Sequence, residues 1–92
     1  MAAAPKKDDL KARFETATVA AKKTKKKPDN ATLLKLYACF KQATEGDVAG
    51  ARPGGLDFVG GAKYDAWSKV KGTTRDDAMQ NYIKLVEKLN RD

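Results

Sequence analysis

Apolar side chains recur at helical spacing in four stretches of this chain, and no stretch shows the strict alternation that marks a β-strand. The clearest pattern places Met79, Tyr82, Ile83, Val86 and Leu89 on one side of a helix. A chain of 92 residues has room for one hydrophobic core, so the sequence predicts a single all-α domain. The four predicted helices cover approximately residues 9–25, 30–44, 61–71 and 75–89.

Capping residues support several of the predicted helix ends. Asp29 or Asn30 can cap the second helix, because either side chain accepts hydrogen bonds from the free N–H groups of a first turn. Thr74 and Asp77 have the spacing of a capping box at the start of the fourth helix. Gly72 suits the position that follows the third helix, where a left-handed backbone is common.

Six of the seven glycines lie between residues 46 and 61, mostly in the connection between the second and third helices. The connection, residues 46–59, has no clear periodicity, and long ordered loops in small domains are usually functional. We expect Leu56 and Phe58 to pin this loop onto the helices. The alternative is a loop that merely crosses the surface.

The chain carries a formal charge of +7 and contains no histidine. The excess of positive charge favours an anionic partner, such as nucleic acid, anionic lipid or a polyphosphate ligand, without choosing among them. Without histidine, and with Cys39 as the one cysteine, neither a nucleophilic triad nor a disulfide within the chain can form. Asp76 and Asp77 are best explained as first-turn charges of the fourth helix. We therefore expect no catalytic residues and no metal site.

A small set of basic and aromatic residues could bind a multiply charged ligand that also has an apolar part. The lysines come from three different helices, and the rings offer a face to a purine and hydroxyl donors to phosphate. Taken singly, each lysine can equally be a solvated side chain, and each tyrosine can be a core residue. Trp67 is interpreted as structural. The candidate binding residues are Lys22, Tyr37, Phe40, Lys41, Lys63 and Tyr82.

Four sequence blocks follow one another with specific gaps. They are Tyr37-x-x-Phe40-Lys41-Gln42-Ala43-Thr44-x-Gly46-Asp47, then Arg52-Pro53-Gly54-x-Leu56-Asp57-Phe58, then Ala62-Lys63-Tyr64-Asp65-Ala66-Trp67, and then Asp77-Ala78-Met79-x-x-Tyr82-Ile83. This order resembles the acyl-CoA-binding protein family. The resemblance extends over roughly residues 14–89, which is nearly the whole chain.

The resemblance implies an up-down-down-up bundle of four helices with a long loop between helices 2 and 3. The domain would span residues 9–92, after a flexible basic segment at residues 1–8. The implied function is non-catalytic binding, buffering and transport of medium- and long-chain acyl-CoA esters, with acyl-CoA as the ligand and no cofactor.

The resemblance also implies a role for each candidate residue. Lys41 and Lys63 would hold the phosphate-bearing nucleotide, and Phe40 would lie against the adenine. Tyr37 and Tyr82 would donate hydrogen bonds near the nucleotide. Lys22 corresponds to a ligand-contacting lysine of the first helix.

The chain departs from the family pattern at four positions. Phe40 stands where the family usually has tyrosine, and Tyr64 replaces a frequent tryptophan. Val59 and Gly61 stand where lysine is common, which removes up to two cations from the rim of the loop. These differences concern affinity and preferred chain length rather than the class of ligand.

The alternative function is that of a basic helical module that binds nucleic acid or an anionic membrane surface. The third and fourth helices superficially match a helix-turn-helix, but Asp76 and Asp77 would face the phosphates. The first residues lack the apolar core of a signal peptide, and no run of residues is long enough to span a membrane. We therefore expect a cytoplasmic monomer that contacts membranes or acyl-CoA-using enzymes transiently.

Overall fold

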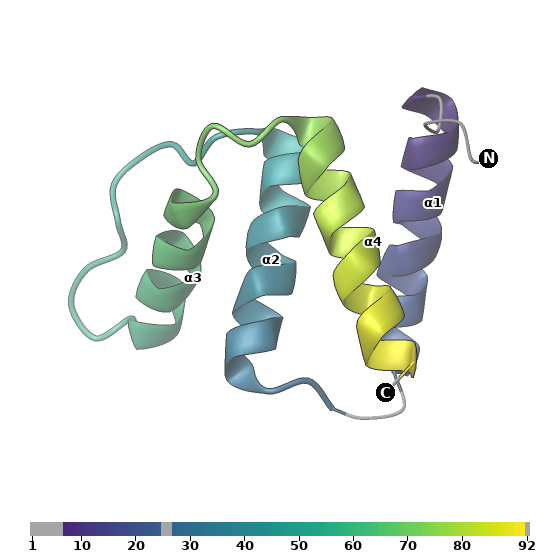
Figure 1. Cartoon of the computed structure of the whole chain (residues 1–92). Helices are drawn as coiled ribbons and strands as arrows, with labels where there is room; N and C mark the ends of the chain where they lie inside the picture. Colours follow the sequence, from purple (N-terminus) through teal and green to yellow (C-terminus); the bar gives the residue numbers. More distant parts are fainter. Residues whose placement is uncertain (1–6, 25–26, 92) are drawn as a thin grey trace.

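Four α-helices and one short 3-10 turn form the computed structural model, which describes residues 7–24 and 27–91 (Figure 1). No strand occurs within these two ranges, and the predicted all-α fold is confirmed. The expected flexible segment at residues 1–8 lies mostly outside the described residues. The elements are α1 (Lys7–Ala20), η1 (Ala21–Lys23), α2 (Asn30–Glu45), α3 (Phe58–Lys69) and α4 (Arg75–Arg91).

The helices lie side by side, with α1 and α4 running in one direction and α2 and α3 in the other (Figure 1). This is the up-down-down-up arrangement that the sequence resemblance implies. Helix α4 packs against both α1 and α2, and α3 packs against α2. The molecule is therefore thin, with a shortest extent of 17 Å. A bundle of this shape exposes two broad faces of α2, one on each side of the layer.

The hydrophobic core lies among α1, α2 and α4. Helix α1 contributes an aromatic ring, a leucine and an alanine, and α2 contributes a leucine and two small side chains. Helix α4 contributes an aromatic ring, two branched aliphatic side chains and an alanine. Among the described residues, no side chain of α3 belongs to this cluster, so α3 depends on other contacts to hold its place. The members of the core are Leu10, Phe14, Ala17, Leu36, Cys39, Ala43, Ala78, Tyr82, Ile83 and Val86.

A buried amide joins α3 and the following turn to α2. Gln42 is 1% exposed, and its Nε2 donates to Asp47 Oδ1 at 2.7 Å and to the carbonyl of Thr73 at 2.8 Å. The indole Nε1 of Trp67 donates to Gln42 Oε1 at 3.1 Å and to the carbonyl of Gly46 at 2.9 Å. Trp67 therefore has the structural role that the sequence predicts. Buried polar groups need such partners, because an unpaired one is costly.

Two predicted helix starts are confirmed by their caps. The carboxylate of Asp29 accepts a hydrogen bond from the Thr32 N–H at 2.7 Å, so Asp29 is the cap of α2. Thr74 Oγ1 accepts from the Asp77 N–H at 3.0 Å at the start of α4.

The expected bounds of the first and third helices are wrong by several residues. Helix α3 starts at Phe58 rather than near residue 61, because the Asp57 carboxylate accepts from the Gly60 N–H at 2.8 Å and caps it there. Helix α1 ends at Ala20, and Thr24 then adopts an extended backbone with φ −67° and ψ 145°. The chain thus leaves helical geometry before the end of the lysine run.

The expectation that Leu56 and Phe58 pin the loop is wrong. These side chains are 88% and 76% exposed. Polar contacts hold the loop instead. Arg52 donates two hydrogen bonds to Asp65 at 2.9 and 3.0 Å, and the Tyr64 hydroxyl donates to the carbonyl of Gly50 at 2.8 Å.

The free energy of unfolding is expected to decrease in acid, because Asp47 and Asp65 are held in their charged form in the folded protein. A hydrogen bond from the Gly72 N–H lowers the pKa of Asp47, and the Arg52 guanidinium lowers that of Asp65. As the pH falls below about 4, the unfolded chain takes up protons before the folded chain does, so the free energy of unfolding decreases. Urea unfolding at pH 7 and at about pH 3 measures this loss. Asp65→Asn should show a smaller loss between the two pH values, and an equal loss would contradict the assignment.

Candidate ligand-binding site

Two lysines from neighbouring helices meet at one tyrosine ring. Lys63 Nζ of α3 lies 5.2 Å from the centre of the Tyr37 ring of α2. Lys41 Nζ of α2 lies 6.0 Å from the same centre and 5.2 Å from the centre of the Trp67 ring. These distances are within the range of cation–π attraction. The structure therefore brings together three of the six predicted site residues, and their positive charges lie on the same side of the molecule.

Lys41 also forms an ion pair with Glu45, one helical turn further along α2. The hydrogen bond to this carboxylate raises the pKa of Lys41 above its ordinary value, so the ammonium is fully charged at neutral pH. A phosphate that binds Lys41 has to share the ammonium group with Glu45 or displace the Glu45 carboxylate. Exposed pairs of this spacing contribute little free energy, so the carboxylate is a weak competitor.

Phe40 is the exposed member of an aromatic cluster between α1, α2 and α4. It is 39% exposed, and its ring centre lies 5.9 Å from that of Phe14, with 26° between the ring planes. The Phe40 and Tyr82 ring centres are 6.2 Å apart, and those of Phe14 and Tyr82 are 5.1 Å apart. Phe40 can thus present apolar surface to a ligand while its other contacts anchor it in the core.

A groove of about 720 Å³ continues from Phe40 between α1, α2 and the start of α4. Its lining combines apolar side chains with two cations and two carboxylates. The apolar members include Phe14, Phe40 and Met79, and the charged members are Lys11, Arg75, Glu15 and Asp76. A volume of this size is typical of small-ligand sites. Of the six predicted site residues, Phe40 is the one that lines this groove.

Tyr82 and Lys22 are placed differently from the other predicted residues. Tyr82 is 6% exposed within the core cluster, and burial raises the pKa of its hydroxyl. Its ring packs against that of Phe40. The sequence allows such a core position for each tyrosine. Lys22 lies exposed in η1 after α1, and no described contact joins it to Tyr37, Lys41 or Lys63. The roles of Lys22 and Tyr82 in ligand binding stay predictions.

Among the described residues there is no group of three or more histidine, cysteine, aspartate or glutamate side chains that could hold a metal ion. Tyr37, Phe40, Lys41 and Lys63 instead combine two cations with a half-buried tyrosine ring and an exposed phenylalanine ring, and Phe40 lines a groove. This arrangement suits an anionic ligand that carries both a flat ring and an apolar chain.

A protein-family model described as "Acyl CoA binding protein" matches residues 11–86 of this chain. The acyl-CoA-binding protein homolog 1 of Caenorhabditis elegans is 47% identical over 76 residues, which are 83% of this chain and 88% of that protein. The chain belongs to the acyl-CoA-binding protein family. The resemblance that the four sequence blocks indicated is confirmed.

Solved structures agree with the family assignment. The crystal structure of Oryza sativa Acyl-CoA-Binding Protein 2 matches with a TM-score of 0.85 at 36% identity, and the match covers 89% of this chain and 91% of that one. A region of the Enoyl-CoA delta isomerase 2 of Rattus norvegicus is also 46% identical over 77 residues. That match covers 84% of this chain but 20% of the isomerase.

The departures from the family pattern have a structural setting. Val59 is an exposed residue in the first turn of α3, so a side chain of any size can stand there. Gly61 is buried, and a Cβ atom at this position would lie 2.7 Å from Arg52 Nη2. A family lysine at residue 61 would have to displace the Arg52 guanidinium, which here is bound to Asp65.

Sequence reasoning missed two residues of the site. Phe14 stacks on Phe40. Its spacing of four residues from Leu10 on a helix is typical of a core position and gives no sign of this contact. Glu45 pairs with Lys41, and the spacing of four residues on a helix could have revealed it.

Proposed function

We propose that this chain binds medium- and long-chain acyl-CoA esters without transforming them and serves as their carrier and buffer. One observation supports this function best: Lys41 and Lys63 lie beside the Tyr37 ring, and Phe40, which neighbours Lys41 on α2, lines a groove. Coenzyme A offers matching parts, namely phosphates, a purine ring and an acyl chain. Membership of the acyl-CoA-binding protein family supports the same ligand class.

The head and the tail of the ligand bind by different physical forces. Lys41 and Lys63 attract the phosphates of the nucleotide, and Tyr37 and Phe40 offer ring surfaces to the adenine. The acyl chain lies on the apolar side chains of the groove beyond Phe40. Each fully buried CH₂ contributes about 0.8 kcal/mol, so longer chains bind more tightly until the groove ends.

A carrier role fits the residues present. No pair of a nucleophile and a base lies beside Tyr37 and Lys63 among the described residues, and the carboxylate near Lys41 is held in an ion pair. We place the function in the cytoplasm, with a monomeric protein that meets membranes or acyl-CoA-using enzymes transiently when it exchanges its ligand. No helix of the described ranges has the length and apolar character needed to cross a membrane.

Trp67 gives a direct test, because Lys41 Nζ lies 5.2 Å from its ring. Binding of phosphates at Lys41 will move this charge and change the fluorescence of the chain's one tryptophan. We expect a saturable change with dodecanoyl- and hexadecanoyl-CoA, a weaker response to free coenzyme A, and tighter binding of the longer ester in calorimetry.

Three controls decide between this function and its competitors. Release of free thiol from the ester over hours would indicate an enzyme. Tight binding of duplex DNA at physiological salt would favour a nucleic-acid-binding module. An equal response to free coenzyme A and to hexadecanoyl-CoA would show that the groove does not bind the acyl chain.

A further inference from the structure

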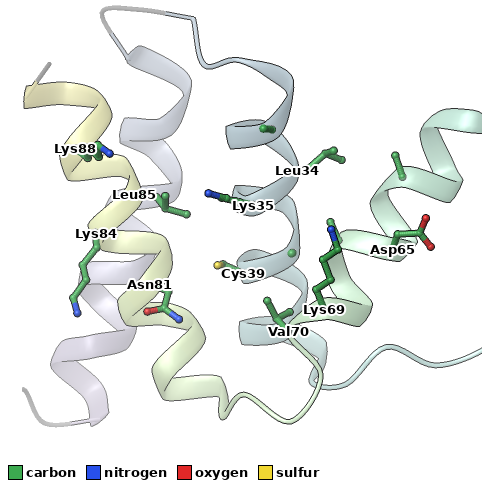
Figure 2. Close-up of a pocket in the computed structure, with 14 residues that line it drawn as sticks. Leu34, Lys35, Cys39, Asp65, Lys69, Val70, Asn81, Lys84, Leu85 and Lys88 are labelled. Atoms are coloured by element: carbon green, nitrogen blue, oxygen red, sulfur yellow. The ribbon is translucent and has the colours of Figure 1, made fainter.

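A second, larger groove lies between α2, α3 and α4, and it contains none of the six predicted site residues (Figure 2). Its volume is about 840 Å³, which is within the range of small-ligand pockets. We call it the α2–α3–α4 groove. Small side chains create the hollow, because alanines stand where larger residues would fill the space between the helices. Its apolar surface comes mainly from Leu34, Ala38, Cys39, Ala66, Val70 and Leu85.

The α2–α3–α4 groove opens on the face of α2 that points away from the acyl-CoA site. On a period of 3.6 residues, the mean direction of the α2 residues that line this groove differs by roughly 135° from that of Tyr37, Phe40 and Lys41. The lining residues of α2 are Ala31, Leu34, Lys35, Ala38 and Cys39. Because the bundle is one helix thick, both faces of α2 remain accessible. A molecule in this groove leaves the acyl-CoA site open.

The rim of the α2–α3–α4 groove is positively charged. Its basic residues are Lys35, Lys69, Lys84 and Lys88. Within the described part of the chain, these lysines form no salt bridge. The acidic residue of the lining, Asp65, is bound by Arg52 through hydrogen bonds of 2.9 and 3.0 Å. The free charge at this rim is therefore cationic.

Charge and apolar surface are unevenly distributed in the α2–α3–α4 groove. Figure 2 shows Lys35 and Cys39 pointing from α2 toward α4, and Leu85 pointing back toward α2. Lys84 and Lys88 stand on α4 beside this half. In the half between α2 and α3, Leu34 and Val70 form the lining together with alanines. Three of the four rim lysines thus stand in the half between α2 and α4, while Lys69 and Asp65 of α3 stand beside the apolar surface of the other half.

We propose that the α2–α3–α4 groove binds a single-chain amphiphile with an anionic head, such as a fatty carboxylate or a lysophosphatidate. The head lies at Lys35, Lys84 and Lys88, and the chain lies over Ala38 and Ala66 toward Val70. Lysine ammonium groups pair with a carboxylate or a phosphate, and the groove of about 840 Å³ has room for a single hydrocarbon chain. Binding here is independent of acyl-CoA on the other face.

Calorimetry with dodecanoate and with dodecyl lysophosphatidate tests the proposal, with and without saturating acyl-CoA. Both compounds are expected to bind at the same site, and the ratio of their dissociation constants shows whether a carboxylate or a phosphate head is preferred. Lys35→Gln/Lys84→Gln is expected to weaken amphiphile binding at least about tenfold, because it removes two charge-assisted contacts. Lys23→Gln/Lys71→Gln removes the same charge from exposed positions outside the groove and should leave the affinity unchanged.

Cys39 supplies an independent readout, because it lines the α2–α3–α4 groove and is the chain's one cysteine. Burial raises the pKa of its thiol, so alkylation by iodoacetamide is slow and is followed at about pH 8.5. Saturating dodecanoate should slow the alkylation at least about fivefold. Ala66→Leu narrows the groove and should remove this protection, with circular dichroism as the check that the variant is folded.

Several results would overturn the proposal. If uncharged dodecyl maltoside bound as tightly as dodecanoate, the lysines would have no role in binding the head. Loss of dodecanoate binding in Lys41→Ala, or its displacement by acyl-CoA, would move the amphiphile to the acyl-CoA site. Sedimentation with vesicles of anionic phospholipid that depends on Lys84, without binding of the single-chain compounds, would assign this face to a membrane surface. If the protein did not bind acyl-CoA, the titration with dodecanoate alone would still test this proposal.

Discussion

Lys63→Ala is expected to weaken the binding of dodecanoyl-CoA about 10- to 100-fold while the unfolding midpoint stays at its wild-type value. The reason is that Lys63 is an exposed residue of α3 whose described contact is with the Tyr37 ring, at 5.2 Å. Its ammonium is thus available to a phosphate, and removal of one charge-assisted contact costs about 1.5–3 kcal/mol. Its removal opens no cavity in the core.

Calorimetry on two matched variants shows whether the effect is local. Lys84→Ala removes the same charge from the opposite face of the bundle and should bind dodecanoyl-CoA as the wild type does. Raising the salt concentration should weaken wild-type binding more than binding by Lys63→Ala, because the variant has one ionic contact less. If Lys63→Ala and Lys84→Ala lost affinity equally, a general effect of net charge would replace the proposed contact.

Lys41→Ala should behave differently from Lys63→Ala. The Lys41 ammonium contacts the Tyr37 and Trp67 rings and pairs with Glu45, so its removal leaves a carboxylate beside the ligand phosphates. Repulsion by Glu45 then adds to the lost attraction. The ordering expected from these contacts is that Lys41→Ala binds at least as weakly as Lys63→Ala.

Local chemistry explains why the helices could be predicted from the sequence. Caps such as Asp29 and Thr74 act within three residues of their partners, so the sequence alone reveals them. The start of α3 was missed because Asp57 and Gly60 lie in a glycine-rich segment without an apolar repeat. Helix periodicity says nothing about such a start.

The loop and the second groove could not be predicted for a different reason. The loop is held by pairs such as Arg52 with Asp65 and Gly50 with Tyr64, which are 13 and 14 residues apart. Contacts at this separation follow from the packing of α3 on α2 and leave no pattern in the chain. The α2–α3–α4 groove comes from missing volume at Ala38 and Ala66, and alanine also occurs in well-filled helices.

The candidate site was predicted in part. The pairing of Tyr37 with Lys41 follows from their spacing on one helix, and Lys63 joins them because α3 lies along α2. Lys22 is joined to them by no described contact, because α1 packs on the far side of α4 from α3. Resemblance to a family thus identified the candidate residues, whereas the distances between them could be obtained only from the folded structure.

Gln42→Leu is expected to lower the free energy of unfolding by about 2–4 kcal/mol, the largest loss of stability among the substitutions considered. The side chain is 1% exposed, so the loss has nothing to do with solvent contacts. Leucine matches its size but removes the amide donor of the Thr73 carbonyl and one of the two donors of Asp47 Oδ1, which keeps the Gly72 N–H. Trp67 keeps its hydrogen bond to Gly46 and loses the one to the amide.

Urea unfolding measures this loss, and Gln80→Leu is the matched control. Gln80 is a half-buried residue of α4 without a described hydrogen bond, so its replacement should change stability by no more than about 0.5 kcal/mol. Because the Gln42 network holds α3 and its turn to α2, Gln42→Leu should also loosen Lys63 and weaken dodecanoyl-CoA binding. Wild-type stability in Gln42→Leu would mean that water replaces the amide at no cost, and α3 would then owe its position to other contacts.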